Sequence, residues 1–154
     1  MRLWRISNYA DLKGLGGLKA SARWHHRGAP VVYTSETPSG ALLEMVVHLE
    51  AHDLSVLPDG YQLLEIDVPE EISMLEFDAQ SLPEHWQRDE SFTSKVGTQW
   101  LSGLSSLLLR IPSAIAPHTF NVLINPLHPH CQRLIITAVN HFPLDERFMK
   151  GKAK

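Results

Sequence analysis

The sequence has 154 residues, enough for one domain that buries roughly two thirds of the surface its unfolded chain would expose. Hydrophobic residues make up 44% of it and charged residues 20%, values that exclude an intrinsically disordered chain, and no run reaches the ~20 apolar residues needed to span a bilayer. The formal net charge of −3 argues against tight nonspecific binding to nucleic acid, which depends on neutralising phosphates with Lys and Arg.

The N-terminal segment and the cysteine content indicate a cytoplasmic protein. MRLWRISNYADLK becomes polar within a few positions and lacks the apolar centre of a signal peptide. The single cysteine, Cys131, excludes an intrachain disulfide and suits a reducing compartment. We expect one domain over residues 1–154, of which 150–154 form a frayed tail.

A Gly-rich stretch, GLGG at 14–17, precedes the first clear strand. It fits neither a dinucleotide-binding loop nor a P-loop, and we interpret it as a mobile connection that could close over a ligand. Arg23 follows in SARWHHRG. A guanidinium suits bidentate contact with phosphate or a ribose diol, and the ordinary alternative is a surface salt bridge.

The segment PVVYT at 30–34 is predicted to be a strand, and a helix follows it after a short turn. Thr37 can cap this helix and Pro38 can open it, and the apolar spacing predicts that it runs to about Glu50. Because short connections join elements that touch, Tyr33 should lie near the start of the helix. A strand tyrosine is otherwise most often a core residue with a hydrogen-bonded hydroxyl.

Glu44 is the carboxylate at the centre of this apolar helix. It lies about 200° around the helix from Leu42, outside the main apolar stripe. Leu43 and Val47 nevertheless flank it, so its own side of the helix is also apolar. A covered carboxylate needs a partner or a ligand. The alternative is a carboxylate at the rim of the helix, solvated or paired to an arginine.

The rest of the chain adds four strands and a second helix. The strands are rich in Val, Ile and Leu and are predicted over 61–68, 106–111, 121–125 and 133–139. The second helix is predicted from Ser94 to Leu104, ending near Gly103. Because strands and helices do not alternate regularly, the pattern favours the α+β class.

Eight segments in this order resemble the RES-domain toxins of bacterial toxin–antitoxin pairs. They are WRI at 4–6, ARW at 22–24, GAPVVYTSE at 28–36, ALLEMVVH at 41–48, VGTQWL at 96–101, RIPSAI at 110–115, NVLINPLHP at 121–129 and FPLDERF at 142–148. Two features depart from the family's commoner GGRWN: His25 replaces the usual Asn, and a glycine before the arginine is missing.

The resemblance implies a compact fold like that of ADP-ribosyltransferases, with a split, mostly antiparallel sheet, and NAD as substrate without a tightly bound cofactor. It assigns catalysis to Glu44, Arg23 and Tyr33. Arg23 and Tyr33 would also contact the substrate, together with Trp24, Ser35, Ser113 and Asn121. The implied partner is an Xre-like helix-turn-helix antitoxin, which would carry the DNA binding for the pair, so that the toxin itself binds neither nucleic acid nor membrane. A homodimer is compatible with the resemblance.

These roles follow from the chemistry of NAD cleavage, whose transition state resembles an oxocarbenium ion. Glu44 would hold the ribose 2′-OH and stabilise the developing charge. Arg23 would hold the pyrophosphate or the adjoining ribose, and Tyr33 would pack against nicotinamide or ribose. Ser113 could hydrogen-bond Glu44 or the nicotinamide amide, or simply stabilise a turn. The acceptor stays open: water, phosphate or a protein side chain would each complete the same first step.

Other classes of function remain as alternatives. A ribonuclease toxin acting with His and Arg is disfavoured by the net charge, and a noncatalytic domain could merely receive an antitoxin tail. His128, His130 and Cys131 have the side chains of a metal site, but their spacing does not place them on one face, so no metal is predicted. Ser113 lacks the G-x-S-x-G context of a serine hydrolase.

Overall fold

The computed structural model describes residues 1–49, 60–141, 145 and 147. The tail predicted at 150–154 and the predicted helix end at Glu50 lie outside these residues. Within the part of the chain that is described, no helix combines the length and apolar character needed to cross a bilayer.

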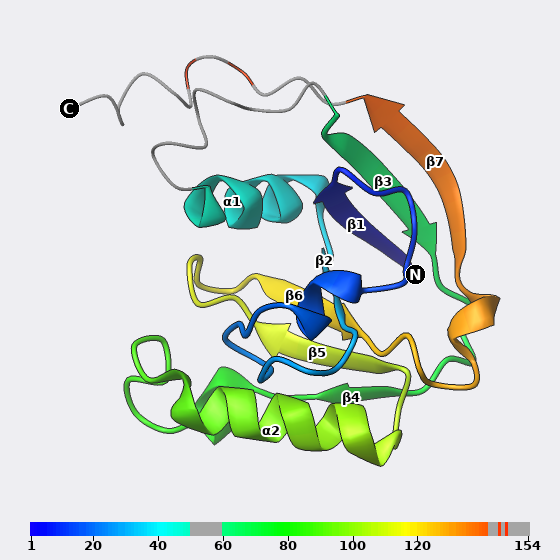
Figure 1. The fold of residues 1–154 in the computed structure, drawn as a ribbon. Helices are drawn as coiled ribbons and strands as arrows, with labels where there is room; N and C mark the ends of the chain where they lie inside the picture. The colour runs from blue at the N-terminus through cyan, green and yellow to red at the C-terminus, as the bar shows by residue number, and fades with distance from the viewer. Residues whose placement is uncertain (50–59, 142–144, 146, 148–154) are drawn as a thin grey trace.

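One mixed sheet of seven strands forms the centre of the fold, in the order β4-β5-β6-β2-β1-β3-β7 (Figure 1). Only β4 and β5 pair in parallel; every other neighbouring pair is antiparallel. The strands are β1 (Arg2–Ser7), β2 (Val32–Ser35), β3 (Gln62–Asp67), β4 (Met74–Glu76), β5 (Leu108–Pro112), β6 (Phe120–Ile124) and β7 (Ile135–His141). The described residues form two α-helices, α1 (Pro38–His48) and α2 (Glu90–Gly103).

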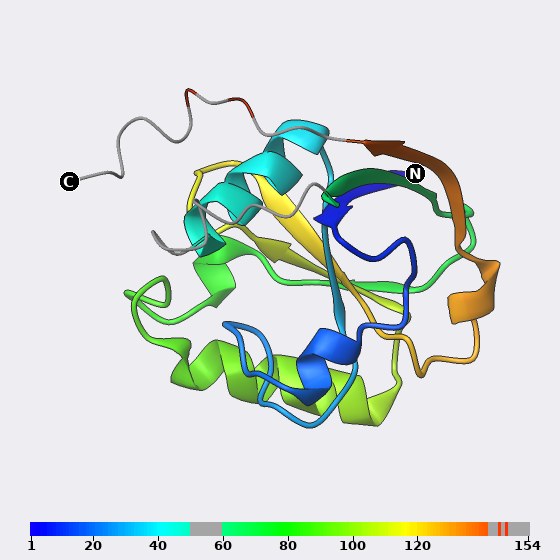
Figure 2. The ribbon, with the colours of Figure 1, turned by 45° about the horizontal axis from the view of Figure 1, so that its top comes forward.

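The sheet is split between β1 and β2. These two strands pair at one position only, Trp4 opposite Ser35, whereas β1 pairs with β3 along its whole length. The sheet therefore consists of one half made of β4, β5, β6 and β2 and another made of β1, β3 and β7 (Figures 1 and 2). Helix α1 contacts both β1 and β2 and so lies at the split. The predicted α+β class and the split, mostly antiparallel sheet are confirmed.

Two apolar cores pack against the sheet. The first joins both half-sheets through side chains such as Leu3, Val32 and Ile66. The second lies under α2 and contains three buried tryptophans, Trp24, Trp86 and Trp100, with β-strand residues. At Gly97 an added Cβ would lie 1.7 Å from the carbonyl oxygen of Trp24, so only glycine allows α2 to approach the turn that carries Arg23 so closely.

The predicted elements are all present, with shifted ends. Each of the five predicted strands is found, and α1 begins as predicted, with the Thr37 side chain accepting the Gly40 N–H. Helix α2 begins at Glu90 rather than Ser94, because Asp89 caps it by accepting the N–H of Ser91. Strands β1 and β4 were not predicted: β4 is three exposed residues, and β1 is a polar-looking segment in which only Leu3 and Ser7 are buried.

The sequence suggested that the Gly-rich segment is a mobile connection, but in the structure it is tied to neighbouring segments by hydrogen bonds. Residues Leu15–Leu18 form a single 3₁₀ turn. The carbonyl oxygen of Gly14 accepts the N–H of Gly17 and of Val31, and the carbonyl oxygen of Gly17 accepts the N–H of Gly28. Gly14 has a φ of 64°, and an added Cβ there would lie 2.7 Å from the Val31 nitrogen. The segment is thus packed against the chain leading into β2.

Candidate active site

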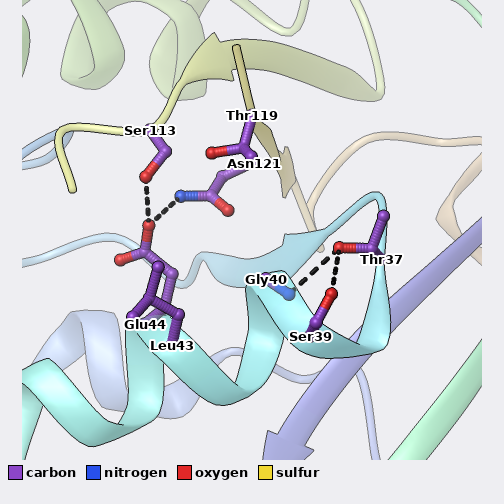
Figure 3. A pocket seen from close by; sticks show the side chains of 8 residues that line it. All are labelled: Thr37, Ser39, Gly40, Leu43, Glu44, Ser113, Thr119 and Asn121. Atoms are coloured by element: carbon purple, nitrogen blue, oxygen red, sulfur yellow. Dashed lines mark hydrogen bonds between the residues drawn. The ribbon is translucent and has the colours of Figure 1, made fainter. Parts of the chain in front are cut away.

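Helix α1 presents Glu44 to two hydrogen-bond donors from the half-sheet that contains β2: Ser113 follows β5, and Asn121 lies on β6. The Glu44 Oε1 atom accepts a hydrogen bond from Ser113 Oγ at 2.9 Å and one from Asn121 Nδ2 at 2.6 Å (Figure 3). The Glu44 side chain is 24% exposed. Its other oxygen, Oε2, lies 3.7 Å from Nε2 of the exposed His48, one helical turn away. The carboxylate is thus oriented through one oxygen and accessible through the other.

Both donors are themselves held in place. Ser113 Oγ accepts the backbone N–H groups of Ile115 and Ala116 at 3.1 and 3.3 Å, so the turn after β5 fixes it. Asn121 Oδ1 accepts the hydroxyl of the buried Ser35 at 2.7 Å, which leaves the Asn121 amide nitrogen facing Glu44. Of the two contacts predicted for Ser113, the hydrogen bond to Glu44 is observed. Ser113 also makes the turn-stabilising contacts that were its alternative role.

Tyr33, on β2, is tied to the buried His25. The Tyr33 hydroxyl lies 2.8 Å from His25 Nδ1, and His25 Nε2 lies 2.9 Å from the carbonyl oxygen of Ala20. Burial raises the pKa of the Tyr33 hydroxyl well above its ordinary value, and burial is also the main cause that lowers the pKa of His25. The phenol and the neutral imidazole are therefore both uncharged near neutral pH.

Arg23 lies in a tight turn closed by reciprocal backbone hydrogen bonds between Ala22 and His25. Its Nη1 donates to the carbonyl oxygen of Trp86 at 3.2 Å, and its Nη2 lies 3.3 Å from Oε1 of Glu90 in the first turn of α2. The side chain is 25% exposed. The salt bridge considered as the ordinary role for Arg23 is therefore present, but its carboxylate partner is 54% exposed. Solvent weakens such a pair, so it can give way to an anionic ligand.

A cleft of about 800 Å³ opens where β1 and β2 separate. It is lined by all three residues predicted to be catalytic, Arg23, Tyr33 and Glu44, and by Ser35 and Asn121. Glu44 and Asn121 also line a smaller pocket of about 140 Å³ (Figure 3). The hydroxyl-bearing residues of that pocket are Thr37, Ser39, Ser113 and Thr119.

Trp24 belongs to the core rather than to the ligand-facing surface. It lines the cleft but is only 2% exposed, and its ring packs against Phe77 and Trp86 with centroid distances of 6.1 and 6.2 Å. Its indole therefore supports the Arg23 turn, and the substrate contact predicted for Trp24 stays a prediction.

Arg5 is a cleft residue that sequence reasoning missed. It lies on β1, across the split from Tyr33, and its Nη1 donates to the carbonyl oxygen of Asp11 at 2.9 Å. Burial lowers the pKa of this guanidinium, and the nearby charge of Asp11 partly offsets the effect. Among the described residues, no carboxylate forms an ion pair with Arg5. Because strand β1 itself was not predicted, the alternation that places Leu3 and Arg5 on one face of a strand was not used to identify Arg5.

The histidine and cysteine side chains near the β6–β7 connection do not form a cluster with metal-site geometry. His128 and His130 stack edge to face with ring centroids 5.3 Å apart. Over residues 1–49, 60–141, 145 and 147, no three His, Cys, Asp or Glu side chains gather closely enough to hold a metal ion.

Comparison with known proteins places this chain in a family. The model of the RES domain matches residues 2–145. A protein named Toxin Res from Pseudomonas putida is 46% identical over 147 residues, 96% of this chain and 99% of the relative. A protein named Prs ADP-ribosylating toxin from a Sphingobium species is 32% identical over 157 residues, 96% of each chain.

The fold has a solved counterpart. A chain in the crystal structure of the M. tuberculosis MbcT–MbcA toxin–antitoxin complex superposes with a TM-score of 0.75 and 16% sequence identity, covering 99% of this chain and 89% of its own. At this identity the likeness concerns the fold. The match of the RES model to nearly the whole chain, joined to close relatives named Toxin Res, shows that the chain belongs to the RES domain family of toxins.

Proposed function

We propose that this RES-domain toxin cleaves the bond between nicotinamide and ribose in NAD. The observation that carries the proposal is the oriented carboxylate of Glu44, which shares one cleft with Arg23 and Tyr33. A family resemblance alone would leave open whether these groups meet. A common cavity of about 800 Å³ is large enough for a dinucleotide to enter at least in part.

A single carboxylate is sufficient for this reaction. The nicotinamide leaving group is already cationic, so its departure needs no general acid, and positive charge develops on the ribose. Ser113 and Asn121 both donate to Oε1 of Glu44, and this leaves Oε2 to accept the ribose 2′-OH and to stabilise the cation. Because the donors are already in place, the carboxylate does not need to reorganise during the reaction.

Two guanidinium groups can hold the phosphates of NAD from opposite sides of the cleft. Arg23 approaches from the turn beside α2, and Arg5 approaches from β1. A half-buried guanidinium whose pKa is lowered by burial is stabilised when an anion binds, which supports a phosphate contact for Arg5 in particular. The aromatic ring of Tyr33 would then pack against nicotinamide or ribose.

The acceptor distinguishes hydrolysis or phosphorolysis from transfer to a protein. Release to water or phosphate would deplete NAD and arrest growth. Transfer to a protein side chain is the second candidate, favoured by the relative named Prs ADP-ribosylating toxin. Both reactions begin with the same bond cleavage, so the roles proposed for Glu44 and the two arginines are common to them.

An antitoxin partner follows from the same reasoning. We propose that a cognate helix-turn-helix antitoxin of the Xre type covers the cleft and blocks NAD entry in the cytoplasm. Support comes from the fold neighbour, which was crystallised as a toxin–antitoxin complex. Co-purification of the two chains, with NAD turnover restored when the antitoxin is removed, would support the assignment; a complex in which the cleft stays open to NAD would contradict it.

The test is turnover of NAD by the purified chain, followed by released nicotinamide and by the mass of the ribosyl product in phosphate and in phosphate-free buffer. We expect Glu44→Gln to lower the rate by at least about 100-fold, because the amide keeps the shape but loses the charge. Glu84→Gln is the matched control, since this side chain is 88% exposed and does not line the cleft. Thermal melting reports whether the variants fold.

Two outcomes would contradict the proposal. Unchanged turnover in Glu44→Gln would remove the carboxylate from the mechanism. Intact NAD with the wild-type chain, under conditions where its expression arrests growth, would redirect the assignment to a ribonuclease or a binding module.

A further inference from the structure

The His25 imidazole makes two hydrogen bonds that together define its protonation. His25 is 3% exposed. Its Nε2 faces the carbonyl oxygen of Ala20, and a carbonyl oxygen can only accept, so Nε2 carries the hydrogen. In a neutral imidazole the other nitrogen has a lone pair and no hydrogen. His25 Nδ1 therefore accepts, and the Tyr33 hydroxyl donates to it across 2.8 Å.

The hydroxyl of Tyr33 is therefore already engaged on the protein side. Its hydrogen is directed at His25 Nδ1. The ring packs partly on the tryptophan core and partly lines the cleft, and it is tilted by 50° to the imidazole. What Tyr33 can offer a ligand is thus its aromatic face rather than its hydroxyl.

His25 also connects three segments that line the cleft. Its backbone closes the turn that carries Arg23, through hydrogen bonds of 3.0 and 3.1 Å with Ala22. Its ring joins the Ala20 segment to Tyr33 on β2. A shift of this one side chain would move the phenol and the Ala20 segment together.

We infer that His25 is a positioning residue, which anchors the Tyr33 hydroxyl so that the tyrosine ring presents a fixed aromatic face to the ribose–nicotinamide end of the substrate. The inference rests on the proposed function for the identity of that substrate. The hydrogen bond to Tyr33, rather than the one to Ala20, is the contact through which His25 affects turnover.

Two substitutions separate these contacts. An asparagine amide reaches about the position of Nδ1 and can still accept from Tyr33, whereas a glutamine amide reaches about the position of Nε2 and can still donate to Ala20. We expect His25→Gln to lower kcat/KM for NAD about tenfold, the scale of one lost buried hydrogen bond, and His25→Asn to stay within about threefold of wild type. His26→Gln is the control, since this neighbouring histidine is exposed and its side chain does not line the cleft.

A purely structural role predicts a different result. Each variant keeps one of the two hydrogen bonds of His25, so we expect similar melting temperatures and a difference in turnover only. In a Tyr33→Phe background the anchored hydroxyl is absent, and His25→Gln should then cause no further loss. Equal turnover of the Asn and Gln variants, or additive losses with Tyr33→Phe, would overturn the inference.

Binding of ADP-ribose, measured by calorimetry on the same variants, separates this inference from the proposed function. If wild type releases no nicotinamide, the proposed function fails. Weaker ADP-ribose binding in His25→Gln than in His25→Asn would still support the positioning role, and equal binding in the two would overturn it.

Discussion

Two polar groups of the cleft, a carboxylate and a phenol, are held in place by hydrogen bonds with other side chains. Glu44 depends on Ser113 and Asn121, and Tyr33 depends on His25. Arg23 differs, because its partner Glu90 is largely exposed and can release it. Preorganised hydrogen bonds of this kind keep a site in its reactive geometry before a substrate arrives. The carboxylate and the phenol are thus fixed, and the guanidinium is adjustable.

The burial of His25 leads to a prediction about stability and pH. Its pKa in the folded chain is below the ordinary value of 6.5, which the unfolded chain approaches, so the unfolded chain binds more protons in the interval between the two values. The free energy of unfolding should therefore fall as the pH drops below about 6.5, and this loss should level off below the lowered pKa.

The measurement is urea denaturation from pH 7.5 to 5, with His25→Asn compared with wild type. The variant should lose the part of the pH dependence that His25 contributes, while the part due to other groups stays in both chains. Parallel curves for the two chains would show that His25 is not the titrating group. Tyr33 does not contribute in this range, because burial raises its pKa.

Some site residues could be predicted from the sequence, and others could not, for physical reasons. Glu44 stands out because a carboxylate is flanked by apolar residues on a helix, and helical periodicity is a strong local signal. In the sequence, His25 stood out only as a departure from a familiar motif. Its contacts with Ala20 and Tyr33 are seen only in the tertiary structure. Arg5 could be identified as a cleft residue only by knowing that β1 and β2 separate. That separation depends on pairing between segments that are distant in the sequence.

At the scale of elements, the start of α1 determines how Glu44 is supported. Gly40 lies in its first turn, and an added Cβ there would lie 2.5 Å from Ser35 Oγ. Ser35 in turn orients Asn121, which donates to Glu44. Because Gly40 has no side chain, there is room for the hydrogen bonds that lead from Ser35 through Asn121 to the Glu44 carboxylate.

We predict that Gly40→Ala lowers both stability and activity. Helix propensity alone would favour alanine by up to about 1 kcal/mol, but the buried Ser35 must move, and this overpacking should cost about 1–2 kcal/mol of unfolding free energy. Displacing Asn121 should lower kcat/KM for NAD about 10- to 100-fold.

Gly103→Ala provides the control within the other α-helix. It is the last residue of α2, and an added Cβ there would meet nothing within 4 Å. Turnover should stay unchanged, with unfolding free energy equal to wild type or slightly higher. A Gly40→Ala variant as stable and active as Gly103→Ala would show that Ser35 adapts without disturbing the carboxylate.

The elements themselves were predictable where local patterns are strong. The five predicted strands carry runs of apolar β-branched and leucine side chains, and Thr37 with Pro38 marks the start of α1. Strand β4 has no buried residue and is ordered by pairing with β5, so periodicity cannot reveal it. The start of α2 depends on the Asp89 cap, which lies five residues before the Ser94 predicted as its beginning.

At the scale of the whole molecule, the split sheet accounts for the position of the cleft. A continuous sheet would have joined β1 and β2 along their length and buried the space between them. Strands β1 and β2 pair with each other only where Trp4 lies opposite Ser35, and they separate beyond that position. Helix α1 contacts both strands at this opening, which brings its carboxylate to the cleft. Side chains from both halves, such as Arg5 and Tyr33, therefore line one cleft.

This arrangement predicts that a bound ligand bridges the two half-sheets. Arg5 belongs to the half with β1, whereas Tyr33 belongs to the half with β2. ADP-ribose at about 100 times its dissociation constant should stabilise the chain by about 2.7 kcal/mol and slow amide hydrogen exchange in both β1 and β2. Exchange followed by mass spectrometry resolves the two strands, because they lie in separate segments of the sequence.

Substitution of Arg5 should uncouple the two strands. Arg5→Gln removes the cation on the β1 side, so we expect ligand-induced protection to persist in β2 and to fall in β1, together with weaker binding. Arg2→Gln is the matched control on the same strand, since Arg2 is 67% exposed, pairs with Glu65 and does not line the cleft. Protection confined to β2 in the wild-type chain would mean that the ligand contacts one half-sheet only, and the split would then be a feature of the fold without a role in binding.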